Sequence, residues 1–169
     1  MAEEMLTVSE TLEPASMIDV LAHPEKYPSY LYCSVPKPDN PTTEQRLQYT
    51  AYVMQMLNQG DYRAAESINE RINLCHVLAH RITVRNVDKD TGEVTEFQAD
   101  RVVLLDDEDK TYEAVSQGLG QSVLVLFQLM GKPDTWDSPV PVVIRQVETK
   151  AGRRTFKLEI WRDKATAKK

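Results

Sequence analysis

Residues 115–131 have the sequence VSQGLGQSVLVLFQLMG, and this segment decides the fold. Ser116 is a candidate N-cap, and Gly131 is typical of a helix end, so the pattern predicts one helix over the whole segment. Its apolar stripe is wide, as in helices that other elements cover. The stripe residues recur at helical spacing: Leu119, Val123, Phe127 and Met130.

Strand-like segments flank this helix, three before it and two after it. They are predicted at residues 76–87, 93–106, 111–115, 141–150 and 155–162. Polar turns with Gly92 and Gly152 separate the first two and the last two. A single helix between the third and fourth strands is the chain order of the OB-fold, a five-stranded Greek-key barrel. We therefore predict an OB-like barrel over residues 74–162.

A helical hairpin is predicted before the barrel, over residues 42–73. Thr43 is the candidate cap of its first helix, and Asp61 that of the second. The hairpin could pack on the barrel or on a second copy of the chain, and the sequence leaves both open. The apolar stripes are Leu47, Ala51, Met54 and Leu57 in the first helix, and Ala64, Ile68 and Ile72 in the second.

Residues 1–41 are predicted to be a mobile tail followed by an extended strap rich in Pro and Tyr. Within the strap, residues 30–35 could pair at a sheet edge. Its tyrosines could pack on the barrel or stack on bases, and packing is the commoner role. Residues 163–169 are predicted to be a frayed basic tail.

The composition of the 169-residue chain is ordinary for one soluble domain with an extension. It contains no apolar run of about 18 residues, and its acidic start is unlike a signal peptide, so we expect a cytoplasmic protein. Two cysteines, Cys33 and Cys75, suit a reducing compartment and are predicted to be free, partly buried thiols.

Charge is distributed unevenly along the chain. The net charge is −6, yet residues 139–169 contain 9 Lys and Arg against 3 Asp and Glu. Such asymmetry can indicate a nucleic-acid contact at one end, because the local field steers a phosphate backbone. A solvated basic tail without a partner explains the same numbers.

An OB barrel that binds single strands needs cations for phosphates and planar groups for bases. The turn between the last two strands fits this requirement, whereas the acidic turn at residues 88–93 does not. Positive charge that protects an exposed sheet edge is the alternative explanation. The candidate nucleic-acid-binding residues are Arg81, Arg85, Arg101, Tyr112, Lys150, Arg153, Arg154, Lys157 and Trp161.

Metal, cofactor and catalytic patterns are weak. His76 and His80 would lie roughly 13 Å apart along a strand, too far to share one ion. Residues 86–97 resemble a calcium loop only superficially, since Phe97 stands where the closing Glu should be. The acidic turn at residues 106–109 could hold a divalent ion or be solvated. We expect no metal, no cofactor and no enzymatic activity.

The chain also resembles a known family over residues 60–161. The similar segments are DYRAAESINERINLCHVLAH, DTGEVTEFQADRVVLLDDEDKTYEAVSQG and GKPDTWDSPVPVVIRQVETKAGRRTFKLEI. They are similar to the small single-stranded-DNA-binding proteins of phages and related mobile elements of Gram-positive bacteria. The resemblance implies non-catalytic binding of single strands during replication in a bacterial host cell. The acidic C-terminal tip of cellular single-strand-binding proteins is replaced by ATAKK.

The sequence thus predicts an α+β protein: a five-stranded OB-like Greek-key barrel with a helix between strands 3 and 4, plus an N-terminal helical hairpin. The predicted function is sequence-independent binding and protection of single-stranded DNA. Replication proteins and a second copy of the chain are further candidate partners, and no membrane is expected. The alternative function is a protein interaction module of the replication or phage machinery.

Overall fold

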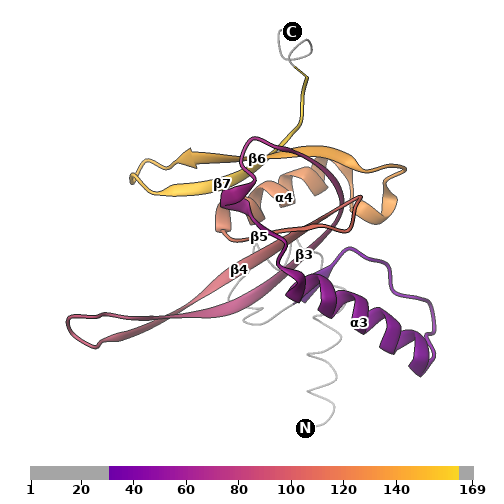
Figure 1. Cartoon of the computed structure of the whole chain (residues 1–169), viewed down its shortest axis with the longest axis horizontal. Coiled ribbons are helices and arrows are strands. Elements are labelled where there is room, and N and C mark those ends of the chain that lie inside the picture. The colour runs from indigo at the N-terminus through magenta and orange to yellow at the C-terminus, as the bar shows by residue number, and fades with distance from the viewer. Residues whose placement is uncertain (1–30, 164–169) are drawn as a thin grey trace.

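The computed structural model describes residues 31–163, which form one seven-stranded sheet with two α-helices (Figure 1). The predicted tail, the start of the strap and residues 164–169 lie outside the described residues. The strands are β1 (Leu31–Cys33), β2 (Tyr62–Arg63), β3 (Arg71–Val87), β4 (Val94–Asp106), β5 (Thr111–Val115), β6 (Val140–Glu148) and β7 (Arg154–Ile160). The helices are α3 (Thr43–Gln59) and α4 (Gln117–Met130), with 3-10 turns η1 (Ala64–Glu66) and η2 (Pro133–Thr135). None of the described helices is long and apolar enough to span a membrane.

The sheet is built around the long antiparallel pair β3 and β4. The strand order is β2-β5-β4-β3-β6-β7, and β1 pairs with β3 outside this path. The two long strands stay in register from His76 opposite Leu105 to Val87 opposite Val94. Their outer halves project beyond the rest of the molecule (Figure 1). We call this projection, residues 82–99, the arm.

Pairing among the five predicted strands is consistent with an OB-like fold. The pairs are β3–β4, β4–β5, β3–β6 and β6–β7. Among the described residues β5 and β7 do not pair, so the sheet is open between them. The prediction of five strands was wrong. β1 adds to the edge of β3 beyond the end of β6, and β2 adds in parallel to the edge of β5.

The prediction of a second helix in the hairpin was also wrong, because residues 61–72 contain β2, η1 and the start of β3. Asp61 does not cap a helix; its side chain accepts a hydrogen bond from the backbone N–H of Thr111 at 3.0 Å. Ala64 and Ile72 lie in the core, and Ile68 forms a bridge to Ile144. The spacing of these apolar residues predicts a helix, but their contacts with β5 and β6 stabilise a different local structure.

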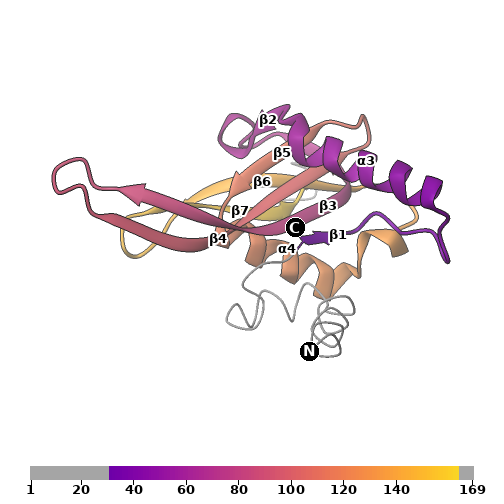
Figure 2. The same cartoon turned by 90° about the horizontal axis from the view of Figure 1, so that it is seen from below.

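The first predicted helix is present as α3, but it packs with another face. Its cap is Thr42 rather than Thr43, in a capping box with Gln45. Val53 and Met56 are buried against the sheet, whereas Leu47 is 66% exposed. Figure 2 shows why: α3 contacts the sheet near its C-terminal end and runs away from it toward its N-terminus. The last turns of α3 therefore decide which of its faces packs against the sheet.

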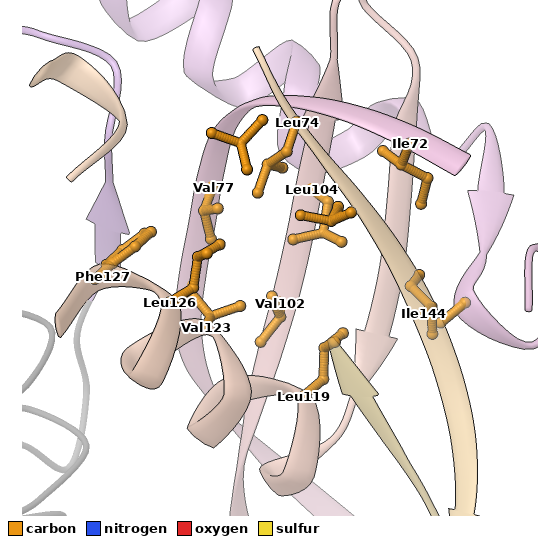
Figure 3. Close-up of a cluster of buried hydrophobic side chains, with 14 residues drawn as sticks. Ile72, Leu74, Val77, Val102, Leu104, Leu119, Val123, Leu126, Phe127 and Ile144 are labelled. Carbon is orange, nitrogen blue, oxygen red and sulfur yellow. The ribbon is translucent and has the colours of Figure 1, made fainter. Parts of the chain in front are cut away.

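Predicted helix 115–131 is confirmed as α4. The side chain of Ser116 accepts a hydrogen bond from the N–H of Leu119, and the N–H of Gly131 donates to Phe127. The two helices cover opposite faces of β3 and β4 (Figure 2). The α4 side holds the main core (Figure 3), which includes Ile72, Leu74, Val77, Val102, Leu104, Leu119, Val123, Leu126, Phe127 and Ile144. The α3 side holds Val53, Met56, Leu78, Val103 and Leu105.

The start of α4 lies directly against β7. A Cβ atom added at Gly118 would lie 2.3 Å from Oγ1 of Thr155 and 2.7 Å from the carbonyl oxygen of Phe156. Only glycine fits at this distance. Helix α4 therefore contacts β7 beside the place where β5 and β7 fail to pair.

Candidate nucleic-acid interface

The turn between β6 and β7 presents a group of exposed cations. Gly152 adopts a positive φ of 79°, and the N–H of Thr149 donates to the carbonyl of Arg153 at 2.7 Å, which closes the turn. Within residues 31–163 these cations make no side-chain hydrogen bond or ion pair. We call them the basic hairpin: Lys150, Arg153, Arg154 and Lys157, all exposed.

The arm is less basic than its single arginine, Arg85, indicates. The exposed Arg85 lies opposite Glu96, with Nε 3.6 Å from Oε1. At the tip, residues 88–93 form the predicted turn, in which the N–H of Asp88 donates to the carbonyl of Glu93 at 2.8 Å. Three of these six residues are Asp or Glu and one is Lys, so the tip is acidic. Residues 82–99 contain two Lys and Arg against four Asp and Glu, so the arm has a net negative charge.

The two other candidate arginines are engaged inside the fold. Arg81 is buried and its guanidinium lies 3.0 Å from Oδ1 of Asp100. Arg101 forms an ion pair with Glu113 and donates to the carbonyl oxygen of Leu57 at the end of α3. Paired guanidiniums at such positions hold elements together and have few donors left for a phosphate.

The aromatic candidates are partly engaged as well. Tyr112 stacks on Tyr62 with ring centroids 5.1 Å apart, and its hydroxyl donates to Asp106 at 2.9 Å. Burial and the neighbouring Asp106 raise the pKa of Tyr112, so its hydroxyl stays protonated. Tyr62 is the outer ring of this pair, at 41% exposed. Trp161 is half-buried, with its Nε1 3.4 Å from Asp163.

A pocket of about 290 Å³ lies where the sheet is open between β5 and β7. Its walls are mostly apolar, and three ionisable side chains stand among them. Ala64 is fully buried, Ala114 and Phe156 are half-buried, and Val115 is 52% exposed. The lining residues are Arg63, Ala64, Ala65, Arg101, Glu113, Ala114, Val115 and Phe156.

The model of the phage single-stranded DNA-binding protein family matches residues 58–161. The chain belongs to this family. Membership confirms the resemblance to phage single-stranded-DNA-binding proteins, without showing the host, and indicates in general terms that the chain binds single-stranded DNA. No curated protein matches the chain.

The family match covers β2 to β7 and leaves out almost all of α3. It therefore contains the basic hairpin, the arm, the Tyr62–Tyr112 stack and the pocket. All nine predicted site residues fall within it. The structure places the four residues of the basic hairpin on the β6–β7 turn and the first half of β7, with Arg154 and Lys157 on opposite faces of the strand, and it places Arg85 on the arm. Arg81 and Arg101 lie within the fold, each beside a carboxylate.

Sequence reasoning missed two residues that line the pocket. Arg63 lies in a segment predicted to be helical, and Phe156 alternates with polar residues in a way that assigns it to the core. The pairing of Arg81 with Asp100, in contrast, had a usable pattern. A hairpin that turns over residues 88–93 places Val87 opposite Val94, and counting outward gives Arg81 opposite Asp100.

The two histidines on β3 have separate partners. His76 Nδ1 lies 3.1 Å from the hydroxyl of Ser34, and His80 Nε2 lies 3.2 Å from Arg101. Burial lowers the pKa of both rings, and Arg101 lowers that of His80 further. Within residues 31–163 no three His, Cys, Asp or Glu side chains are grouped to hold a metal ion. Cys33 and Cys75 are confirmed as free, half-buried thiols.

Proposed function

We propose that this chain binds single-stranded DNA without sequence preference and protects it during replication of a phage or mobile element. The observation that carries the proposal is the basic hairpin, a set of exposed cations without acidic partners among the described residues. It lies within the segment that the family model matches. Phosphate contacts carry no sequence information, so a strand held there is bound whatever its bases.

The proposal divides the nine candidates by what surrounds them. Lys150, Arg153, Arg154 and Lys157 are free to bind phosphates. Arg85 is a weaker contact, because it must share its charge with Glu96 at 3.6 Å. Arg81 and Arg101 position the strands that carry the interface. Their role is structural, because if either arginine turned toward a phosphate, its carboxylate partner would be left unpaired inside the fold, which is unfavourable.

Bases are stacked by aromatic residues on the same protein. The stack of Tyr62 on Tyr112 exposes its outer ring, and Trp161 follows the last residue of β7. Stacking is tolerant of sequence, since every base has a π face. We propose that these cations and aromatic rings act together on an OB-like fold, which commonly binds oligonucleotides.

A titration of fluorescein-labelled oligo-dT, followed by anisotropy, tests the proposal. We expect binding at low salt that weakens as salt rises, because each phosphate contact releases counterions. Oligo-dC and a mixed sequence should bind with similar affinity, and a duplex of equal length should bind more weakly. Absence of binding at low salt, or binding that is indifferent to salt, would show that the chain is an interaction module instead.

A further inference from the structure

The pocket between β5 and β7 is mostly apolar, and an apolar site is not needed for phosphate contacts. Its walls come from three separate parts of the chain: β2 with η1, the β4–β5 pair, and β7. Ala64 is 1% exposed and sits deep, while Ala65 and Val115 are exposed at the rim. A concave apolar site with a few polar groups is what small aromatic ligands require.

Size limits what can enter. A volume of about 290 Å³ is at the lower end of ligand sites in proteins, which range over roughly 300–1,000 Å³. It is suitable for a single flat ring system and too small for a length of strand. The half-buried ring of Phe156 offers a stacking surface, and the planar guanidinium of Arg63 offers a second.

The polar groups in the pocket tolerate more than one ring. The side chain of Arg63 is exposed and makes no hydrogen bond or ion pair within residues 31–163. Arg101 and Glu113 form an ion pair at the wall, and Arg101 also donates to the carbonyl oxygen of Leu57. Few of their polar atoms are left to read the edge of a ring, so the pocket does not select one base over another.

The pocket also adjoins the basic hairpin. Phe156 and Arg154 are two residues apart on β7, so their side chains leave the same face of the strand, roughly 7 Å apart along it. Arg154 is exposed and belongs to the basic hairpin. A phosphate bound at Arg154 is therefore roughly 7 Å along the strand from Phe156.

We propose that the pocket receives one unstacked nucleobase of the bound strand, with the base between Phe156 and Arg63 and its phosphate at Arg154. This inference rests on the proposed function. It assigns a base site to the opening of the sheet, where no stacking residue was predicted. One base per protein enters it, and the neighbouring bases are held elsewhere.

The experiment compares two oligonucleotides of equal length: oligo-dT, and the same strand with abasic residues at every internal position. The wild-type chain should bind oligo-dT more tightly than the abasic strand. Ala65→Met narrows the pocket from its exposed rim without adding an aromatic ring. Phe156→Leu removes the stacking ring and keeps an apolar side chain. Each should weaken oligo-dT binding by roughly 5- to 150-fold, the range of one base–aromatic stack, and leave abasic binding unchanged.

Ala51→Met is the matched control, since Ala51 is an exposed alanine on α3, outside the matched segment. It should change neither affinity. Circular dichroism and urea unfolding confirm that each variant is folded. If Ala65→Met and Phe156→Leu both keep the wild-type preference for oligo-dT over the abasic strand, the pocket is not a base site. If the wild-type chain binds neither strand, the proposed function itself fails.

Discussion

The salt dependence of binding should fall when cations are removed from the basic hairpin. Arg153 and Arg154 are both exposed, and within residues 31–163 neither forms an ion pair, although Glu148 lies opposite Arg154 in the strand register. Each is therefore available for one phosphate. For single strands each phosphate contact adds about 0.7 to the slope of log affinity against log salt. Replacing both by Ala should therefore lower the slope by about 1.4. Between about 50 and 200 mM salt, the variant should lose about sevenfold less affinity than the wild type.

The assay is anisotropy of labelled oligo-dT at four or more salt concentrations, repeated with a second sequence. Both sequences should weaken alike, since phosphate contacts do not read bases. Arg145→Ala is the matched control on the same hairpin. Its NH1 donates to Asn69 at 2.6 Å and its Nε lies 3.6 Å from Glu159, so it has little charge to offer a phosphate. A wild-type slope in Arg153→Ala/Arg154→Ala, or an equal loss in Arg145→Ala, would refute the reasoning.

Three further predictions concern stability, each measured by urea unfolding. Arg101→Met should lower the free energy of unfolding by about 1–3 kcal/mol, because Glu113 loses its partner, and adding Glu113→Gln should recover part of this. Gly118→Ala should destabilise the protein, since overlap with β7 outweighs a gain of about 1 kcal/mol in helix propensity; a higher unfolding midpoint would contradict the packing. Burial lowers the pKa of His76 and His80 from 6.5 in the folded chain, so the unfolded chain binds more protons as pH falls. Stability should be full above pH 6.5 and decline below it, and His76→Asn/His80→Asn should flatten that decline.

The parts of the fold that follow local rules could be predicted from the sequence. Helix α4 has a cap at Ser116, an end at Gly131 and a wide apolar stripe, and all three appear in the structure. Near the core the long strands alternate in burial or are buried on both faces, whereas their outer ends are exposed on both faces. The turns at residues 88–93 and 149–153 then set the registers of two hairpins. These features depend on residues that are close together in the chain.

Features that depend on distant contacts could not be predicted. Ala64 and Ile72 have helical spacing but reach the core through a strand and a 3-10 turn, because β5 and β6 offer partners. The apolar stripe of α3 includes Leu47, yet the packed face is decided where the helix crosses the sheet. Arg101 similarly finds Leu57 and Glu113 only after folding. The sequence therefore shows which residues are cationic, but not which of them already have a carboxylate partner in the fold.

That distinction explains how a chain with a net charge of −6 can serve as a DNA-binding protein. Three arginines of β3 and β4 lie beside a carboxylate: Arg81 faces Asp100, Arg85 faces Glu96, and Arg101 pairs with Glu113. Their charges are cancelled locally, together with those of their partners. In the basic hairpin Glu148 lies opposite Arg154, but among residues 31–163 none of the four cations forms an ion pair with a carboxylate. A phosphate backbone responds to charges within about 8 Å at physiological salt, so we expect the unpaired cations, rather than the total charge, to decide where the strand binds.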